Sequence, residues 1–379
     1  MDKVKHILFL FATILLLWGN EKFAEAAEEN SGLGPLEIRD QFPVTLPYLS
    51  MSPENTSTIE DNVFFFSYQL AVANTFLNSA GRNKQITKDE ISRGLVEADF
   101  FSSKTGKPVP GYHTYIDVES YRHVFRIKYG LFDVMEFGLE LPYVTFAGGS
   151  LDIGSEFVHS LVGIDNSSAA GAYRSQSERN RYDYYIQQDD QFLINTDSQF
   201  ENIPGDPILK FKWNFWEGNS IFPAITLKLV YKLATANRST EQKLISSGHS
   251  DFGSYLIFSK TYGDWVVYLG WGHSDFGKSE NFSSELSHRF VALEYRLDSD
   301  LSIVLQTMSQ SSIFPTSGSL FGTQQEVGSA FLSNLTDVAV IGYKQWLGAL
   351  FIEAGFIEDY NQTGNQTDIV LFFELGQKW

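Results

Sequence analysis

The chain has 379 residues, a formal net charge of −18 and no cysteine, and aromatic residues make up 15% of it. The lack of cysteine excludes a lipoprotein anchor and a disulfide framework, and the negative charge argues against nucleic acid or anionic lipid as a primary partner. Few segments show the amphipathic helical pattern expected of a soluble enzyme. Many segments of about ten residues instead alternate with period two, which is typical of transmembrane β-barrels.

The first 26 residues have the layout of a signal peptide. Lys3 and Lys5 precede an apolar stretch from Ile7 to Trp18, and Ala24-Glu25-Ala26 supplies the small residues of a cleavage site. The alternative is an uncleaved anchor helix, although the apolar stretch is shorter than the roughly 18 residues of a spanning helix. We expect cleavage before Ala27, which removes three acids and three bases and leaves the net charge at −18.

Residues 27–62 show no periodicity and are punctuated by Gly34-Pro35-Leu36, Pro43, Pro47 and Pro53. They predict an extended N-terminal segment that stays in the periplasm or plugs the barrel. Residues 63–379 then form the barrel itself. The predicted fold class is all-β, a transmembrane antiparallel up-and-down β-barrel of about 12 strands.

Each predicted strand has one apolar face, as Phe64, Phe66 and Tyr68 illustrate in the first strand. The predicted strands cover residues 63–75, 112–130, 134–146, 206–216, 221–234, 251–262, 265–273, 289–297, 301–310, 336–344, 349–357 and the C-terminal stretch to Trp379. The second is long enough to include an extension beyond the membrane or a bulge near Ser120.

The connections between these strands alternate in length. Long connections such as 76–111 and 147–205 alternate with brief turns such as Phe132-Asp133 and Gly263-Asp264. Outer-membrane barrels have short periplasmic turns and long external loops, so both termini should lie in the periplasm.

Tryptophans support this orientation. Trp216, Trp265, Trp346 and Trp379 fall at short-turn ends of strands, and Trp271 falls near the opposite rim. Indole rings gather at both membrane interfaces because they are amphipathic. The alternative is ordinary core tryptophan in a soluble β protein, in which such regular alternation of loop length is rare.

Charged residues occupy the opposite parity to the apolar ones, which predicts that they line a lumen because a lysine or arginine at the bilayer midplane costs about 2–4 kcal/mol. The predicted lumen and selectivity residues are Arg122, Arg126, Lys128, Glu136, Glu140, Lys210, Lys212, Lys228, Lys232, Glu294, Glu353 and Glu374. If Leu131 meets Met135 across the turn, Arg126 lies opposite Glu140. Lys260 shares the apolar parity and must snorkel to the interface.

Two interpretations of this interior remain open. A basic wall over the second, fourth and fifth strands, with acids elsewhere, would set a transverse field across a pore and select small solutes. The same residues would also suit a lumen of mutually satisfied ion pairs that conducts nothing. Twelve strands leave more room than eight, but far less than the roughly 16–18 of porins.

A hexapeptide is duplicated, as Gly248-His249-Ser250-Asp251-Phe252-Gly253 and Gly272-His273-Ser274-Asp275-Phe276-Gly277. Its histidines and aspartates suggest a metal site, and His beside Ser suggests hydrolysis. A two-residue turn at Gly263-Asp264 pairs Phe258 with Leu269, however, and puts His273 and Asp275 on the opposite face from His249 and Asp251. We therefore predict a rim motif, with no metal, no cofactor and no catalytic residue.

Two loop stretches carry weaker signals. Phe157-Val158-His159 suggests a short helical insertion, and a lone histidine there is more often structural. The stretch Arg181–Asp190 is rich in Tyr and Asp and could bind cations or sugar, but we predict a solvated loop.

The C-terminus repeats the barrel pattern. Ile369, Leu371, Phe373 and Leu375 alternate, and the chain stops on Trp379. This resembles the C-terminal signature of bacterial outer-membrane β-barrels, although Gln377 stands where an apolar residue is usual. The resemblance implies a closing strand that the outer-membrane insertion machinery recognises.

Further motifs resemble a family of bacterial outer-membrane proteins known as a domain of unknown function. They are Gly34-Pro35-Leu36 with Gln41-Phe42-Pro43, Tyr129-Gly130-Leu131 before Glu140-Leu141-Pro142, Gly148-Gly149-Ser150-Leu151-Asp152 before His159, Gly205-Asp206-Pro207 with Lys210, and Glu358-Asp359 ahead of Asp368. The resemblance spans most of the mature chain and implies fold and location, not an activity.

The sequence therefore predicts an outer-membrane barrel in contact with the lipid bilayer, exported with a cleaved signal peptide, that acts as a narrow channel or binding protein for a small polar or charged solute. One alternative is a lipid-modifying enzyme that works at the outer rim. Another is a structural or adhesive barrel that acts through its long loops.

Overall fold

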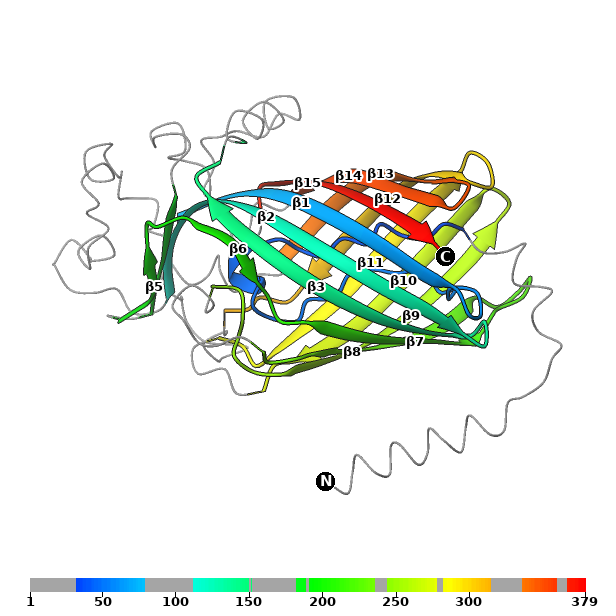
Figure 1. Ribbon diagram of the computed structural model, residues 1–379, viewed down its shortest axis with the longest axis horizontal. Helices are drawn as coiled ribbons and strands as arrows, with labels where there is room; N and C mark the ends of the chain where they lie inside the picture. Colours follow the sequence, from blue (N-terminus) through cyan, green and yellow to red (C-terminus); the bar gives the residue numbers. More distant parts are fainter. Residues whose placement is uncertain are drawn as a thin grey trace, which may run out of the picture.

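A computed structural model describes residues 32–78, 112–149, 151, 182–188, 191–235, 244–277, 282–314, 336–359 and 367–379. Among them, twelve antiparallel strands form a closed barrel (Figure 1). These strands are β1 (Phe64–Asn78), β2 (Tyr112–Leu131), β3 (Met135–Ala147), β7 (Ile208–Trp216), β8 (Ala224–Lys232), β9 (Asp251–Tyr262), β10 (Trp265–Asp275), β11 (Glu285–Arg296), β12 (Leu301–Gln310), β13 (Thr336–Leu347), β14 (Leu350–Asp359) and β15 (Ile369–Lys378).

The barrel closes because β1 pairs on one side with β2 and on the other with β15. Phe66, for example, lies opposite Ile127 on β2 and opposite Gln377 on β15. The red C-terminal strand therefore lies beside the blue β1 in Figure 1. Closure gives each of the twelve barrel strands a partner on both sides, which a sheet exposed to lipid requires.

The turns set the register that the sequence predicts. Phe132 and Asp133 both have φ of 56°, the left-handed conformation of a tight hairpin turn. Leu131 consequently pairs with Met135, and Arg126 pairs with Glu140. The hairpin of β9 and β10 also matches its prediction, because Phe258 pairs with Leu269.

Three short strands lie within the long connection that the sequence treats as a loop. They are β4 (Asp183–Gln188), β5 (Gln191–Thr196) and β6 (Phe200–Pro204). The predicted solvated loop at residues 181–190 is wrong over the described part, because Tyr184 and Ile186 are fully buried. These strands escape prediction because they are too short to show alternation and face no lipid.

The outer half of β2 is an extension and not a bulge. Its residues Tyr112 to Asp117 pair with β4, and the pairing with β1 and β3 continues through Ser120 without a shift. The end of the barrel that carries this extension and the long connections is called the long-loop end here, and the other is the short-turn end. The long-loop end is at the left in Figure 1.

One predicted strand needs correction. The predicted strand over 221–234 is shorter in the structure, because Ile221 and Phe222 form the turn before β8 and are exposed. The long connection after it is described only in part. The signal peptide, its cleavage site and His159 lie outside the described residues.

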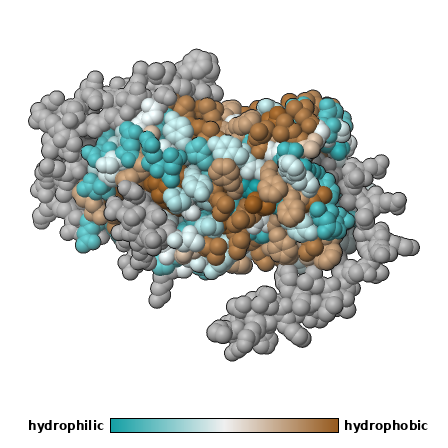
Figure 2. Space-filling model, viewed as in Figure 1, coloured by the Kyte–Doolittle hydropathy of each residue, from teal (hydrophilic) through white to brown (hydrophobic). Residues whose placement is uncertain are grey.

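The outer wall presents apolar side chains and the interior presents polar ones. Phe125, Val291 and Leu305 face outward and are each about half exposed, and brown side chains gather over the barrel wall in Figure 2. Lys260 faces outward near the short-turn end. Its ammonium donates a hydrogen bond to the Asn219 carbonyl, as snorkelling predicts. No helix in the described parts of the chain is long and apolar enough to cross a bilayer.

Candidate functional site

The candidate site is the barrel interior. All twelve residues predicted to line the lumen point into it, and eleven of them are classed as buried, with the Lys210 side chain only 9% exposed. The interior is not an open pore, however. Residues 32–62, called the lumenal segment here, run inside the barrel from near its short-turn end to the long-loop end and back again (Figure 1).

The ascending limb of the lumenal segment binds the wall through its backbone. The Leu33 and Gly34 amides donate to Glu294, at 2.8 and 3.0 Å. The Lys344 ammonium donates to the Pro35 carbonyl at 2.7 Å. An extended chain without strand partners must find hydrogen bonds elsewhere, and here inward-facing side chains of the wall provide them.

Glu37 adds a charged contact to this limb. Its carboxylate accepts hydrogen bonds from Lys128 at 2.8 and 2.9 Å, and its backbone amide donates to Glu353 at 3.0 Å. Lys128 lies on β2 and Glu353 lies on β14, and β1 and β15 lie between these two strands. Glu37 therefore bridges two regions of the wall.

At the long-loop end the segment turns back through a small folded knob. The Arg39 guanidinium donates to the Tyr48 carbonyl at 3.1 Å and the Thr45 carbonyl at 2.8 Å, so it ties the two sides of the turn together. Asp40 accepts hydrogen bonds from the Phe42 amide and the Thr45 hydroxyl, both at 3.1 Å. Arg39 is buried and its hydrogen bonds among the described residues go to the segment's own backbone, so the knob is organised internally.

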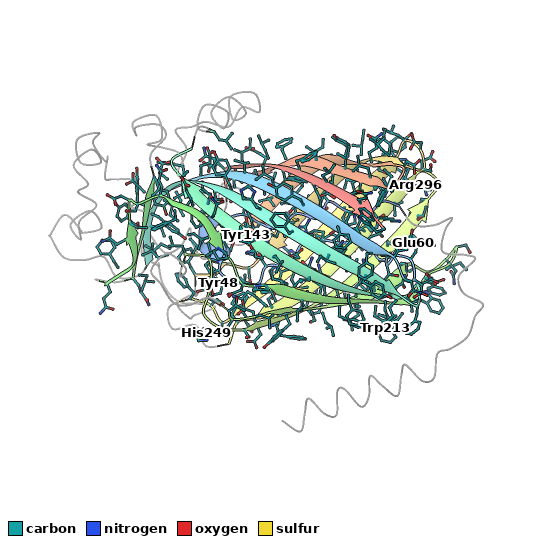
Figure 3. All side chains as sticks on the ribbon, viewed as in Figure 1. Tyr48, Glu60, Tyr143, Trp213, His249 and Arg296 are labelled. Carbon is teal, nitrogen blue, oxygen red and sulfur yellow. The ribbon has the colours of Figure 1, made fainter. Side chains whose placement is uncertain are left out.

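The knob is embedded in an apolar cluster. Its Phe42 and Leu49 are almost fully buried, and the Tyr48 ring lies 5.0 Å from that of Phe276 and 6.0 Å from that of Phe282. Tyr48 and His249 both lie at the left, long-loop end in Figure 3. Apolar packing therefore seals this end, whereas polar contacts dominate farther down.

The descending limb carries the most highly connected acid of the segment. The Glu54 carboxylate lies 2.7 Å from the ammonium groups of both Lys210 and Lys228, and 3.9 Å from that of Lys212. Its side chain is only 1% exposed. Closer to the short-turn end, the Thr226 hydroxyl donates a hydrogen bond to the Thr56 carbonyl at 2.6 Å.

The segment leaves the barrel across Gly130. The Asn62 amide donates to the Gly130 carbonyl at 3.1 Å, and the Gly130 amide donates to the Val63 carbonyl at 3.0 Å. Nearby, burial raises the pKa of Glu60, but the hydrogen bond from Lys378, a backbone hydrogen bond and the charge of Lys378 together outweigh it and hold the pKa of this carboxyl below its usual value. Glu60 lies at the short-turn end in Figure 3.

We expect Gly130→Ala to destabilise the protein by about 1–3 kcal/mol through overpacking. A Cβ at this position would lie 2.1 Å from the Glu60 carbonyl oxygen and 2.3 Å from that of Ile59, and backbone atoms cannot move aside as a flexible side chain can. Urea unfolding followed by tryptophan fluorescence measures the loss. Gly138→Ala is the matched control, because its nearest contact is the Lys210 Cβ at 3.2 Å.

The wall has its own ion pairs beside those of the segment. The predicted pair of Arg126 and Glu140 forms, with 2.8 Å between Nε and Oε1, and Arg126 also reaches Glu374. Further wall pairs are Lys210 with Glu140 at 2.7 Å, Lys212 with Glu136 at 3.2 Å, Lys344 with Glu353 at 3.1 Å, and Lys232 with Asp251 at 2.8 Å. Buried charges need such partners because desolvation is costly.

Sequence reasoning missed the partners that the lumenal segment supplies. Glu37 and Glu54 lie in a stretch with no periodicity, so parity assigns them to no face. Their only sequence signal is that they are acids in a chain stretch that precedes a wall rich in inward-facing lysines. The predicted basic side of the wall therefore exists, but in this conformation segment carboxylates cover it.

The duplicated hexapeptide does not form one site. Asp251 is buried inside and bonds the Leu49 amide at 2.9 Å, whereas Asp275 is exposed on the outer face. Within the described residues, no group of three or more His, Asp or Glu side chains is placed to hold a metal ion. A Ser–His hydrogen bond does occur, between Ser274 Oγ and His288 Nε2 at 3.1 Å, but both residues are buried in the interior, away from lipid.

The chain matches no family model and no curated protein. Among solved structures, an outer-membrane channel from Pseudomonas putida F1 is similar with a TM-score of 0.52 and 9% identity, over 87% of this chain and 100% of that chain. The NanC porin has a TM-score of 0.37 and 8% identity, over 68% of this chain and 91% of that one. A mutant of the TodX monoaromatic hydrocarbon channel also has a TM-score of 0.37, with 9% identity, over 90% of this chain and 98% of that one. The first likeness shows that this chain has the fold of an outer-membrane β-barrel.

Proposed function

We propose that the protein is an outer-membrane channel for a small polar or charged solute. The lumenal segment closes this channel, and movement of the segment opens it. The observation that carries this proposal is that the barrel is complete without the segment. All twelve strands pair with one another around the ring, and residues 32–62 contribute no strand to the sheet. Removing the segment from the lumen would break no pairing between strands of the wall.

The contacts that hold the two limbs also favour a movable segment. Most are hydrogen bonds and ion pairs between the segment and polar wall side chains, as with Glu37 and Lys128 or Glu54 and Lys228. Water can replace such contacts at a small net cost, because each typical hydrogen bond contributes only about 0.5–1.5 kcal/mol to stability. An apolar interface of the same extent would resist hydration.

The proposal includes the location. Long connections at one end and short turns at the other support an outer-membrane orientation with the short turns in the periplasm. We further infer export by a cleaved signal peptide over residues 1–26, insertion through β15 by the outer-membrane assembly machinery, and membership of the domain-of-unknown-function family that the motifs resemble. The enzyme alternative gains no support from the described rim, where His249 and His273 do not converge.

A disulfide clamp tests the channel. The Thr56 hydroxyl oxygen on the segment lies 2.6 Å from that of Ser259 on β9, which suits a bond of about 2.05 Å between two sulfurs. The chain has no native cysteine to interfere. We expect the double variant T56C/S259C to carry current in planar bilayers when reduced, and to lose nearly all of it when oxidised.

The single variants T56C and S259C are the controls, and oxidation should leave their currents unchanged. Equal currents in the oxidised and reduced double variant would show that solute does not pass through the space that the segment fills. Absence of current from the wild-type protein and from every reduced variant would contradict the channel itself.

A further inference from the structure

Two buried lysines of the wall depend on the lumenal segment for their negative partner. Lys228 is 1% exposed, and its ammonium lies 2.7 Å from Glu54 and 3.0 Å from the Ser52 carbonyl. Lys128 forms its ion pair with Glu37. Within the part of the chain that the structure describes, neither lysine has a wall carboxylate at ion-pair distance. The other buried wall lysines with ion pairs, such as Lys212 and Lys344, each have at least one wall carboxylate.

The empty space beside Glu54 is also cationic. A cavity of about 10 Å³ lies there, which is roughly the space that one water molecule needs. Its charged lining consists of Arg39, Arg122, Arg126, Lys210, Lys228 and one carboxylate, Glu140. Arg122 is 3% exposed and makes no hydrogen bond or ion pair with the described residues.

A buried guanidinium without a partner is costly unless the site serves to bind an anion. The segment currently supplies one carboxylate to this region, and among the described residues Arg122 has no carboxylate at ion-pair distance. When the segment withdraws, Glu37 and Glu54 leave with it. Among the described residues, the wall then retains Arg122 and Lys128 on β2 and Lys228 on β8 without a carboxylate at ion-pair distance.

We propose that the solute of this channel is a small organic anion whose carboxylate takes the position that Glu54 occupies in the closed state. This inference rests on the proposed channel function and names its substrate class. Lys210 and Lys228 bind the carboxylate as they now bind Glu54, and Arg122 adds a second cationic contact. Charge-assisted bonds of this kind are the strong ones, and a guanidinium fork matches a carboxylate well.

The same geometry gives the gate a simple mode of opening. Glu54 is tethered next to its lysines, so the closed state is favoured when no anion is present. An anion that reaches the lumen competes with Glu54 for Lys210 and Lys228 and shifts the population toward the open state. Solute and gate therefore compete for one cationic site.

Reversal potentials of single channels test the inference. Full-length protein in a gradient of potassium acetate should pass acetate in preference to potassium. The double variant K210Q/K228Q should lower the permeability ratio of acetate to potassium about tenfold. The variant removes two positive charges from a buried site, where salt screens charge interactions only weakly. Arg296→Gln is the matched control. Arg296 bonds the Gly263 carbonyl at the short-turn end, far from Glu54, and its loss should leave the ratio unchanged.

Potassium-selective current in the wild-type protein would overturn this inference and leave the channel function standing. Absence of any current would instead contradict the channel, so the two failures are distinguishable. An unchanged ratio in K210Q/K228Q would show that anions do not bind these lysines.

Glu54→Gln supplies a second test that keeps the lysines. The amide is isosteric with the carboxylate but carries no charge, so the gate should open more often without acetate. Added acetate should raise the open fraction of the wild-type channel several-fold more than that of the Glu54→Gln channel. An equal response of the two proteins would show that acetate does not compete with Glu54.

Discussion

Arg126→Ala is expected to be the most destabilising single substitution in the wall, with a loss of about 3–5 kcal/mol in the free energy of unfolding. The guanidinium lies 2.8 Å from Glu140, bonds Glu374, and donates to the Gln69 side chain at 2.9 Å. Each of these residues is buried. Alanine leaves Glu140 with Lys210 alone and leaves Glu374 without a cation at ion-pair distance among the described residues. A buried unpaired charge costs far more than the lost pair contributes.

Urea unfolding in detergent micelles, followed by tryptophan fluorescence, measures this loss as a lower midpoint. The control Arg296→Ala removes a similar side chain at the short-turn end and should cost less than about 1 kcal/mol, as surface ion contacts do. A double-mutant cycle with Glu140→Ala should show coupling, because Arg126 and Glu140 form a direct ion pair. Simple additivity of the two losses would show that Arg126 and Glu140 do not stabilise each other.

The sequence alone predicts half of this Arg126 network. A tight turn at Phe132-Asp133 fixes the β2–β3 register, so parity and spacing bring Arg126 opposite Glu140. The contact with Glu374 could not be predicted in the same way. Glu374 lies on β15, beyond β1, and the register across the closing strands joins the two ends of the chain without a turn to count from.

The same reason explains how well the wall could be predicted and how poorly its contents could. Alternation in the wall strands arises because lipid and lumen impose opposite demands on successive residues. The lumenal segment faces protein on all sides, so Glu37 and Glu54 meet no such alternation. Proline and glycine mark residues 32–62 as irregular, but irregular backbone is equally compatible with a periplasmic tail. Only the contacts between Glu54 and its lysines in the folded structure show that these residues lie inside the barrel.

Deleting residues 33–58 is expected to give a folded barrel that conducts at voltages where the full-length protein is closed. The ring of strands keeps all its backbone hydrogen bonds, and β1 to β15 closure begins at Phe65, beyond the deletion. Water fills the emptied lumen and hydrates Lys128, Lys228 and Glu294. The desolvation penalty that their buried partners now offset therefore disappears together with those partners.

Some apolar packing is lost with Phe42 and Leu49, which lowers stability at the long-loop end but breaks no strand pairing. Resistance of the folded form to denaturation in detergent without heat checks folding, and planar-bilayer current checks opening. A variant that folds but stays closed would place the barrier in the apolar cluster around Phe276 and Phe282, not in the lumenal segment. Should the deletion fail to fold, the full-length pair E37Q/E54Q removes the same two charges, and its closed probability must fall below that of the wild-type protein for the segment to be the gate.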